Sequence, residues 1–229
     1  MQVEMMLDHL PWHALHTEHA RFAVSTGSAS RYPEDVTPFA ATSDYSAKSM
    51  KELATLLAPG ETTYLMGDKP AMVADLNYGE IFPCLQMTLP DSPRSLPDND
   101  HTVSVVPLTN DDARAMLELT NVAFPGFFRI RTCEMGTYFG IRLGNDLIAM
   151  AGERMALPGY REISGVCTHP ALRGKCYAVH LIAHLMEEHA QAGMRSFLHV
   201  SSANATAIPI YRRLGFIIRR EVLLYPVSR

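Results

Sequence analysis

The sequence feature that most constrains the fold is the stretch from Arg161 to Ala178, REISGVCTHPALRGKCYA. Its first half is short, apolar and rich in β-branched residues, and it stops at His169-Pro170, which predicts a buried strand. Its second half, from Arg173, is a turn of small and basic residues that leads into a helical pattern. A strand, a tight turn and a helix in this order direct free backbone N–H groups and the positive end of the helix dipole at one spot. We therefore predict a phosphate-binding turn.

Two well-known phosphate loops do not match this turn. A nucleoside-triphosphate loop needs a glycine where His169 stands and a Ser or Thr hydroxyl where Cys176 stands. A dinucleotide fingerprint needs further glycines, and Gly174 has no glycine partner in the turn. A nucleotide-utilising enzyme is therefore disfavoured.

The turn resembles the acetyl-coenzyme A loop of the GNAT acyltransferases, Gln/Arg-x-x-Gly-x-Gly/Ala. Ala171 to Cys176 occupies this loop, and Arg173 and Gly174 match it. Ala171 departs at the first position and Cys176 at the last. Cysteine is still small, so a loop that works through main-chain N–H groups tolerates it better than a bulky residue.

A second family signature follows in the expected order. Asn204, Ala207, Tyr211, Gly215 and Phe216 match the family pattern N-x-x-A-x-x-x-Y-x-x-x-G-F at every fixed position. Asn204 is a suitable N-cap residue and Gly215 is suited to end a helix, so the same pattern predicts a capped helix. The resemblance covers the chain from Val103 to its C-terminus.

The resemblance implies an α/β (α+β) fold in which helices flank a mixed, mostly antiparallel sheet. It also implies an acetyl-CoA-dependent N-acetyltransferase that moves an acetyl group to a primary amine of a small molecule or peptide, by direct transfer in a ternary complex. The alternative is a catalytically silent GNAT domain that binds acyl-CoA as a sensor or partner module.

The same resemblance implies where acetyl-CoA, the expected co-substrate, binds. The main chain at the end of the first strand would pair with the pantetheine arm, the turn would hold the pyrophosphate, and the capping asparagine would touch the pantetheine. In this sequence the implied coenzyme-binding residues are Val166, Cys167, Thr168, Arg173, Gly174, Lys175, Cys176, Tyr177, Ala178 and Asn204.

Two residues are the candidate catalytic groups. Tyr211 occupies the position at which the family places a tyrosine against the thioester sulfur, as general acid; the alternative is a half-buried core tyrosine. Glu162 is the first choice for the base, and such a base is expected to have a raised pKa or to work through water. If their strands pair, Glu153 would face the same cleft. Alternatively, Glu162 forms a surface salt bridge with Arg161 or Arg154. His199 and His169 are the weaker candidates for the base.

The chain divides at a segment rich in proline and acidic residues, Pro90 to Asp100. We predict an N-terminal α/β domain over 1–95 and the GNAT domain over 101–229. The N-terminal part is either a degenerate copy of the same fold or an unrelated cap, and in both cases it is expected to wall the acceptor pocket. Within it, Met1 to Ala23 is predicted as a helix started or interrupted at Pro11, and Ser25 to Ser46 as a loop.

Composition narrows the function classes. The chain has 229 residues and a net charge of -4, which argues against sequence-independent nucleic-acid binding. Its four cysteines include no C-x-x-C pair, and neither Cys167 nor Cys176 has a motif partner for nucleophilic catalysis, so both are expected to be structural.

Histidines at 9, 13, 16 and 19 recur at helical spacing, but a solvated face explains them better than a metal site. We expect no metal and no membrane partner, a cytoplasmic location, and a monomer or homodimer.

Overall fold

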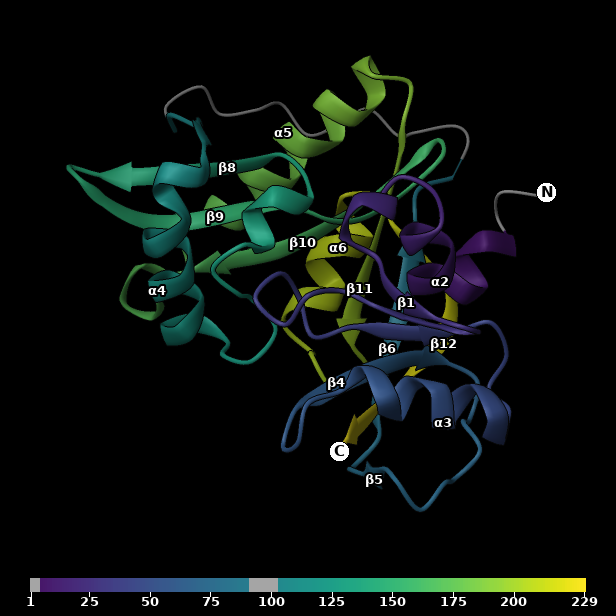
Figure 1. The fold of residues 1–229 in the computed structure, drawn as a ribbon. Helices are drawn as coiled ribbons and strands as arrows, with labels where there is room; N and C mark the ends of the chain where they lie inside the picture. The colour runs from purple at the N-terminus through teal and green to yellow at the C-terminus, as the bar shows by residue number, and fades with distance from the viewer. Residues whose placement is uncertain (1–4, 91–102) are drawn as a thin grey trace.

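A long mixed β-sheet forms the frame of the molecule in the computed structural model, which describes residues 5–90 and 103–229 (Figure 1). The sheet has nine strands in the order β4-β12-β6-β11-β10-β9-β8-β7, and β5 pairs with β12. The strands are β4 (Thr62–Gly67), β5 (Asn77–Tyr78), β6 (Phe82–Thr88), β7 (Val106–Leu108), β8 (Tyr138–Leu143), β9 (Asp146–Leu157), β10 (Tyr160–Thr168), β11 (Arg195–Ser201) and β12 (Ile217–Ser228).

All neighbours in this sheet are antiparallel except β10 and β11, which are parallel. The parallel pair is joined by the long helix α5 (Tyr177–Gln191), as a crossover connection requires. The fold predicted from the sequence, a mixed and mostly antiparallel sheet flanked by helices, is therefore confirmed.

Helices cover both faces of the sheet. The helical segments are η1 (Leu7–His9), α2 (Leu10–Leu15), η2 (Ala20–Phe22), α3 (Ala47–Leu56), η3 (Asn110–Asp112), α4 (Ala113–Ala123), η4 (Thr132–Met135), η5 (Pro170–Leu172), α5 and α6 (Ala207–Arg213). None of them, within the described part of the chain, is both long and apolar enough to cross a membrane.

The alternation of side chains along the central strands separates two cores. Ile163 of β10 and Leu198 of β11 pack with α5 and α6 in one cluster. Phe197, one position earlier on β11, packs on the opposite face against the N-terminal segment, in a cluster with Leu10 and Tyr32. Successive residues of a strand point to opposite faces, so this register places α5 and α6 behind the sheet and the N-terminal segment in front of it.

Strand β6, which precedes the predicted linker, lies between β11 and β12. The two predicted parts of the chain thus contribute strands to one sheet. Apart from Pro90, the predicted linker Pro90 to Asp100 lies outside the described residues. The division into domains 1–95 and 101–229 stays a prediction. The interpretation of the N-terminal part as a degenerate copy of the same fold also stays a prediction.

The N-terminal segment differs from the sequence prediction in two places. From η1 to η2 it forms three short segments in place of one helix, although α2 starts beside Pro11, where the sequence predicts that the helix starts or is interrupted. Residues 25–46, predicted as a loop, contain a small three-stranded sheet of β1 (Val24–Thr26), β2 (Ala29–Arg31) and β3 (Ala40–Thr42). Strands of three residues are too short to show a hydrophobic alternation, which is why the sequence does not reveal them.

Candidate active site

Strands β10 and β11 separate halfway along their length. They pair from Tyr160 and Arg195 up to Ile163 and Leu198. Beyond that point β11 continues against β6, whereas β10 continues to Thr168 against β9 alone. Among the described residues, no strand therefore covers the side of β10 that faces β11 over its last residues. An uncovered strand edge offers N–H and C=O groups to an extended ligand.

The end of β10 contains a β-bulge at Gly165. Ser164 pairs with Gly152 and Cys167 with Met150, so β10 has one more residue than β9 in this interval. Gly165 has φ +62°, and a Cβ added to it would lie 3.2 Å from Cε1 of Tyr138. Both observations favour glycine at this position. The residues predicted to face the pantetheine, 166–168, lie at and beyond this bulge.

The turn after β10 ends in a left-handed residue. Cys176 has φ 56° and ψ 14°, and it is the only non-glycine residue of the described chain with positive φ. Its carbonyl oxygen accepts hydrogen bonds from the N–H groups of Val179 and His180, so it starts α5. The αL conformation explains why glycine suits this loop position, at which the sequence departs from the family pattern.

The same turn has the features of an anion site. Arg173, Gly174 and Lys175 are exposed, and the side chain of Cys176 does not cap α5. The first turn of a helix leaves its N–H groups without intrahelical partners, and here they stand beside two basic side chains. This arrangement suits an anion such as the pyrophosphate of coenzyme A.

Tyr211 and Asn204 lie on the α6 side of the sheet. The ring of Tyr211 packs against Phe216 with centroids 6.2 Å apart, and burial raises the pKa of its hydroxyl to about 12. A hydroxyl with this pKa stays protonated at neutral pH, as a general acid must. Oδ1 of Asn204 accepts a hydrogen bond from the N–H of Ala207 at 3.0 Å, so Asn204 caps α6.

Glu162 is fully buried and fully bonded. Its carboxylate accepts hydrogen bonds from Nη2 and Nε of Arg154 at 2.5 and 3.0 Å, from Nδ1 of His199 at 2.8 Å and from the N–H of Met155 at 3.1 Å. Burial by itself raises the pKa of this carboxyl, but Arg154 and His199 outweigh burial and lower the pKa to about 2. The expectation of a raised pKa is therefore wrong for Glu162. Glu162 does pair with Arg154, one of the two arginines considered above, but the ion pair lies in the interior and not on the surface.

Glu153 does not share a cleft with Glu162. Its Oε1 is 2.9 Å from Nε2 of His189 on α5, and Nδ1 of that histidine is 2.8 Å from Oγ of Ser196. Glu153 and His189 line a cavity of about 240 Å³ on the α5 side. Glu162 instead lies on the opposite face of the sheet, which the N-terminal segment covers. The prediction that the two carboxylates face one cleft is therefore wrong.

The sequence gives no signal for the polar network around Glu162. Nε2 of His199 is 3.1 Å from Nε2 of Gln86 on β6, and Gln86 also donates to the carbonyl oxygen of Leu7. Nη1 of Arg219 on β12 donates to Oε1 of Gln86 at 2.8 Å. The network thus crosses five neighbouring strands beneath the N-terminal segment. Its members come from separate parts of the chain, so no local motif identifies them.

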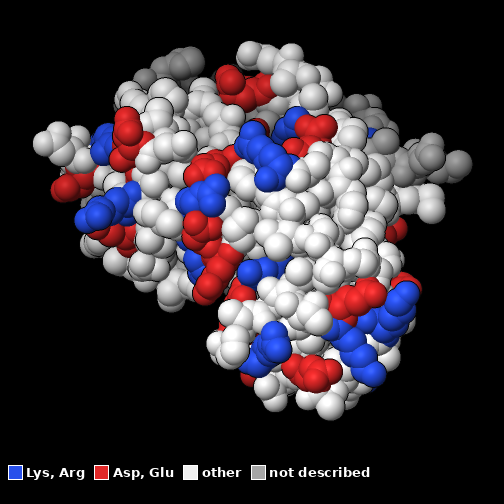
Figure 2. Space-filling view, in the orientation of Figure 1, with Lys and Arg blue, Asp and Glu red and all other residues white. Residues whose placement is uncertain are grey.

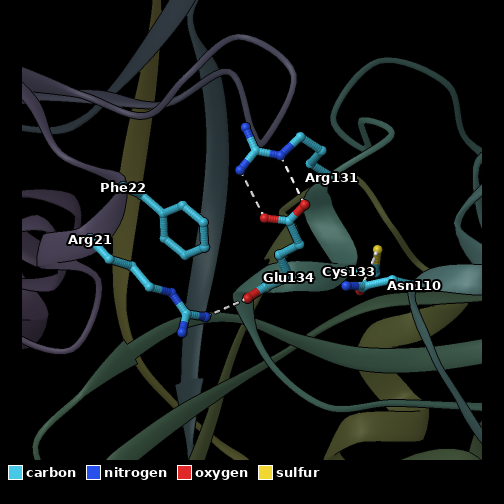
Figure 3. Close-up of a pocket in the computed structure, with 6 residues that line it drawn as sticks. All are labelled: Arg21, Phe22, Asn110, Arg131, Cys133 and Glu134. Carbon is cyan, nitrogen blue, oxygen red and sulfur yellow. Dashed lines mark hydrogen bonds and ion pairs between the residues drawn. The ribbon is translucent and has the colours of Figure 1, made fainter.

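A cavity of about 550 Å³ opens between the N-terminal segment and the region of η4 (Figure 3). Arg21 and Phe22 come from η2, and Arg131, Cys133 and Glu134 come from η4 and the residue before it. Figure 3 shows Arg21 and Arg131 reaching Glu134 from different sides. Asn110 of η3 completes the lining and accepts a hydrogen bond from the thiol of Cys133 at 3.5 Å. None of these residues was identified from the sequence.

Cys84, Cys133 and Cys167 are buried and Cys176 is exposed, all as free thiols. Burial raises the pKa of Cys167 to about 12, which makes it a poor nucleophile. Over residues 5–90 and 103–229, no group of three or more His, Cys, Asp or Glu side chains is placed to hold a metal ion.

Comparisons with known proteins agree with this geometry. The family model described as FR47-like protein matches residues 138–224, which contain the bulged strand, the basic turn and α6. A crystal structure of an acetyltransferase assigned to the GNAT family, from Novosphingobium aromaticivorans, is 30% identical with a TM-score of 0.87, over 97% of this chain and 98% of that one. No curated protein sequence matches the chain significantly.

More distant structures share the fold alone. A GCN5-related N-acetyltransferase from Kribbella flavida is 17% identical with a TM-score of 0.60, over 89% of this chain and 88% of that chain. One from Sphaerobacter thermophilus is 17% identical with a TM-score of 0.52, over 72% and 59%. The separation of β10 from β11, the basic turn and the likeness to the Novosphingobium structure support an acyltransferase. The chain belongs to the GNAT family.

Proposed function

We propose that the protein is an acetyl-CoA-dependent N-acetyltransferase that acetylates a primary amine of a small molecule or peptide. The observation that carries the proposal is the uncovered edge of β10 beyond Ile163, which runs directly into the basic turn before α5. An extended arm along this edge would end with its diphosphate at the turn.

The coenzyme would be held mainly by the main chain. The edge at Val166, Cys167 and Thr168 would pair with the pantetheine arm as an added strand. The turn from Arg173 to Ala178 would bind the diphosphate through N–H groups, with Arg173 and Lys175 adding positive charge. When bound, acetyl-CoA supplies an acetyl group already activated as a thioester.

In the reaction, the amine nitrogen bonds to the acetyl carbon, the carbon–sulfur bond breaks, and the leaving sulfur needs a proton. We assign that proton to the hydroxyl of Tyr211, which is buried yet protonated at neutral pH. The acceptor amine gives up a proton in the same reaction. A positioned general acid contributes about 10²–10⁴-fold to such a rate, and alignment of the two substrates contributes more.

The role of Glu162 as base stays a prediction, and its surroundings favour another role. A carboxylate with a pKa of about 2 holds protons weakly at neutral pH. We therefore propose that Glu162 positions Arg154 and His199, and that the proton of the amine leaves through water.

One observation favours the second candidate function, an acyl-CoA-binding module without turnover. Glu162 and Glu153 are both tied to cationic or histidine partners, so neither is available as a strong base. Calorimetric titration with acetyl-CoA combined with an assay of thiol release over a panel of amines separates the two functions. Binding together with amine-dependent thiol release is the result expected for the enzyme, and binding without release for any amine would favour the module.

A matched pair of variants tests whether coenzyme binding uses the predicted turn. Arg173→Ala is expected to weaken acetyl-CoA binding about tenfold, since it removes one charge-assisted contact to a phosphate. Arg114→Ala, at an exposed arginine of α4, should leave the affinity unchanged. Equal affinities for both variants would argue against the turn as the binding site.

A further inference from the structure

We propose that the cavity beside η4 is the acceptor site and that Arg21 selects an amine that also carries a carboxylate. This inference rests on the proposed acetyltransferase function and narrows its substrate class. It follows from the charges around the cavity, from the way Arg21 is held, and from the position of the cavity relative to β10.

Among the described residues, Arg21 is the arginine of this cavity that forms no ion pair with a carboxylate. Arg131 is neutralised twice, because its Nε and Nη2 each lie 2.8 Å from the carboxylate of Glu134 and its Nη1 lies 3.3 Å from Asp35. The lowered pKa of Glu134 reflects this bond with Arg131. Arg21 bonds only the carbonyl oxygen of Glu134, at 2.7 Å. The two arginines and the carboxylates of Glu134 and Asp35 balance in charge, so Arg21 is distinguished by its free N–H groups and not by an excess of charge.

The guanidinium of Arg21 is also held in place. It lies over the ring of Phe22, with Cζ 4.8 Å from the ring centroid, and Phe22 itself is buried. One N–H is used by the carbonyl of Glu134, and the other N–H groups bond to no acceptor among the described residues. A planar guanidinium fixed in this way matches a carboxylate in two-point geometry, and less entropy is lost on binding than for a mobile side chain.

The cavity borders residues that pack against β10. Cys133 lines the cavity and packs in one cluster with Tyr138 and with Cys167 of β10. The ring of Tyr138 reaches the bulge at Gly165, and its buried hydroxyl has no hydrogen-bond partner in the described chain. A buried hydroxyl without a partner calls for an explanation, and a ligand group that reaches it would supply one.

The volume of about 550 Å³ suits a small molecule. The free N–H groups of Arg21 favour an acceptor that carries an anionic group, which a polyamine lacks. Elsewhere on the face drawn in Figure 2, acidic and basic side chains are interspersed, so selection by charge must be local. An α-amino acid or a peptide with a nearby carboxylate meets both conditions.

The test compares amine probes that differ only at the position of the carboxylate. They are the common α-amino acids, their neutral carboxamides and the corresponding aminophosphonates. Each is assayed for acetyl transfer and, without coenzyme, for its effect on the thermal unfolding of the protein. The variants are Arg21→Gln, which removes the guanidinium charge and keeps an amide donor, and Arg114→Gln, an exposed control on α4. The wild type should prefer acids over amides about 10–100-fold in kcat/KM, mainly through KM.

Arg21→Gln should remove this preference while leaving acetyl-CoA binding and transfer to the amides unchanged, and Arg114→Gln should behave as wild type. Acids should raise the unfolding temperature of the wild type and of Arg114→Gln, but not that of Arg21→Gln. Equal treatment of acids and amides by an active wild type, a preference for phosphonates, or an equal loss for both probes in Arg21→Gln would each overturn the inference. Acid-selective binding without any transfer would support the Arg21 site and count against the acetyltransferase function.

Discussion

Arg154 and Glu162 form a two-point ion pair in the interior of the protein, with Nη2–Oε1 and Nε–Oε2 distances of 2.5 and 3.0 Å. Burying two charges costs free energy that their attraction offsets only when the remaining polar groups are also bonded. Here His199 and the backbone of Met155 complete the set around the carboxylate. The pair therefore joins β9 and β10 to β11 at the level where β10 and β11 begin to separate.

Glu162→Gln should destabilise the protein strongly, because it leaves the guanidinium of Arg154 buried without a countercharge. Removal of one partner of a buried pair typically costs about 3–5 kcal/mol of unfolding free energy. Urea unfolding at neutral pH measures the loss. Glu18→Gln removes the partly exposed partner of Arg161 and should cost no more than about 1 kcal/mol. Equal losses in the two variants would show that the interior pair contributes no more than a surface one.

The same ion pair predicts loss of stability in acid. The pKa of Glu162 is lowered from 4.5 to about 2 in the folded protein, so the unfolded chain binds this proton more tightly. The stabilisation is therefore complete above pH 4.5 and is lost as the pH falls from 4.5 toward 2. Unfolding temperatures measured across this range should decline less steeply for Glu162→Gln than for the wild type. Parallel declines would assign the acid sensitivity to other groups.

The αL conformation of Cys176 predicts that a smaller side chain stabilises the turn. A non-glycine residue in this conformation costs about 1–2 kcal/mol, and glycine avoids that cost while losing some entropy. Cys176→Gly should therefore raise the unfolding free energy by about 0.5–1 kcal/mol. Ala178→Gly, in the first turn of α5, should lower it by a similar amount. If Cys176→Gly instead destabilises the protein, the thiol has a packing role that outweighs the strain.

A structural feature of this protein can be predicted from the sequence when the residues that determine it are close together along the chain. The turn at Arg173 and the helix that starts after Asn204 are contiguous patterns, so the start of α5 after the turn and the cap at Asn204 follow from the sequence. The pKa of Glu162 does not, because it is set by Arg154 and His199, which pairing across strands brings to it. The insertion of β6 between β11 and β12 is equally non-local.

The same reason explains the missed cavity. Arg21 and Glu134 are far apart in the sequence and meet only because the N-terminal segment covers the sheet. Neither residue lies in a recognisable motif. Side chains that gather from separate segments are found from a structure and not from spacing.

Gly165→Ala should disturb the proposed coenzyme edge as well as stability. Its φ of +62° makes any side chain strained, and the new Cβ would come within 3.2 Å of the ring of Tyr138. Gly144→Ala is a matched control, since Gly144 also has φ +62° but nothing lies within 4 Å of its added Cβ. Both variants should lose about 1–2 kcal/mol from the backbone alone. Only Gly165→Ala should also weaken acetyl-CoA binding in a calorimetric titration, and equal affinities would place the coenzyme away from the bulge.

Tyr211→Phe should separate turnover from binding. It removes the hydroxyl that we assign as the proton donor to the leaving sulfur and keeps the ring that packs on Phe216. The loss of a general acid should reduce kcat by at least about 10²-fold, while acetyl-CoA affinity stays within about twofold. Tyr225→Phe, at another buried tyrosine with a raised pKa, controls for the loss of a hydroxyl in the core. A wild-type kcat in Tyr211→Phe would remove this tyrosine from the mechanism and leave solvent water as the source of the proton.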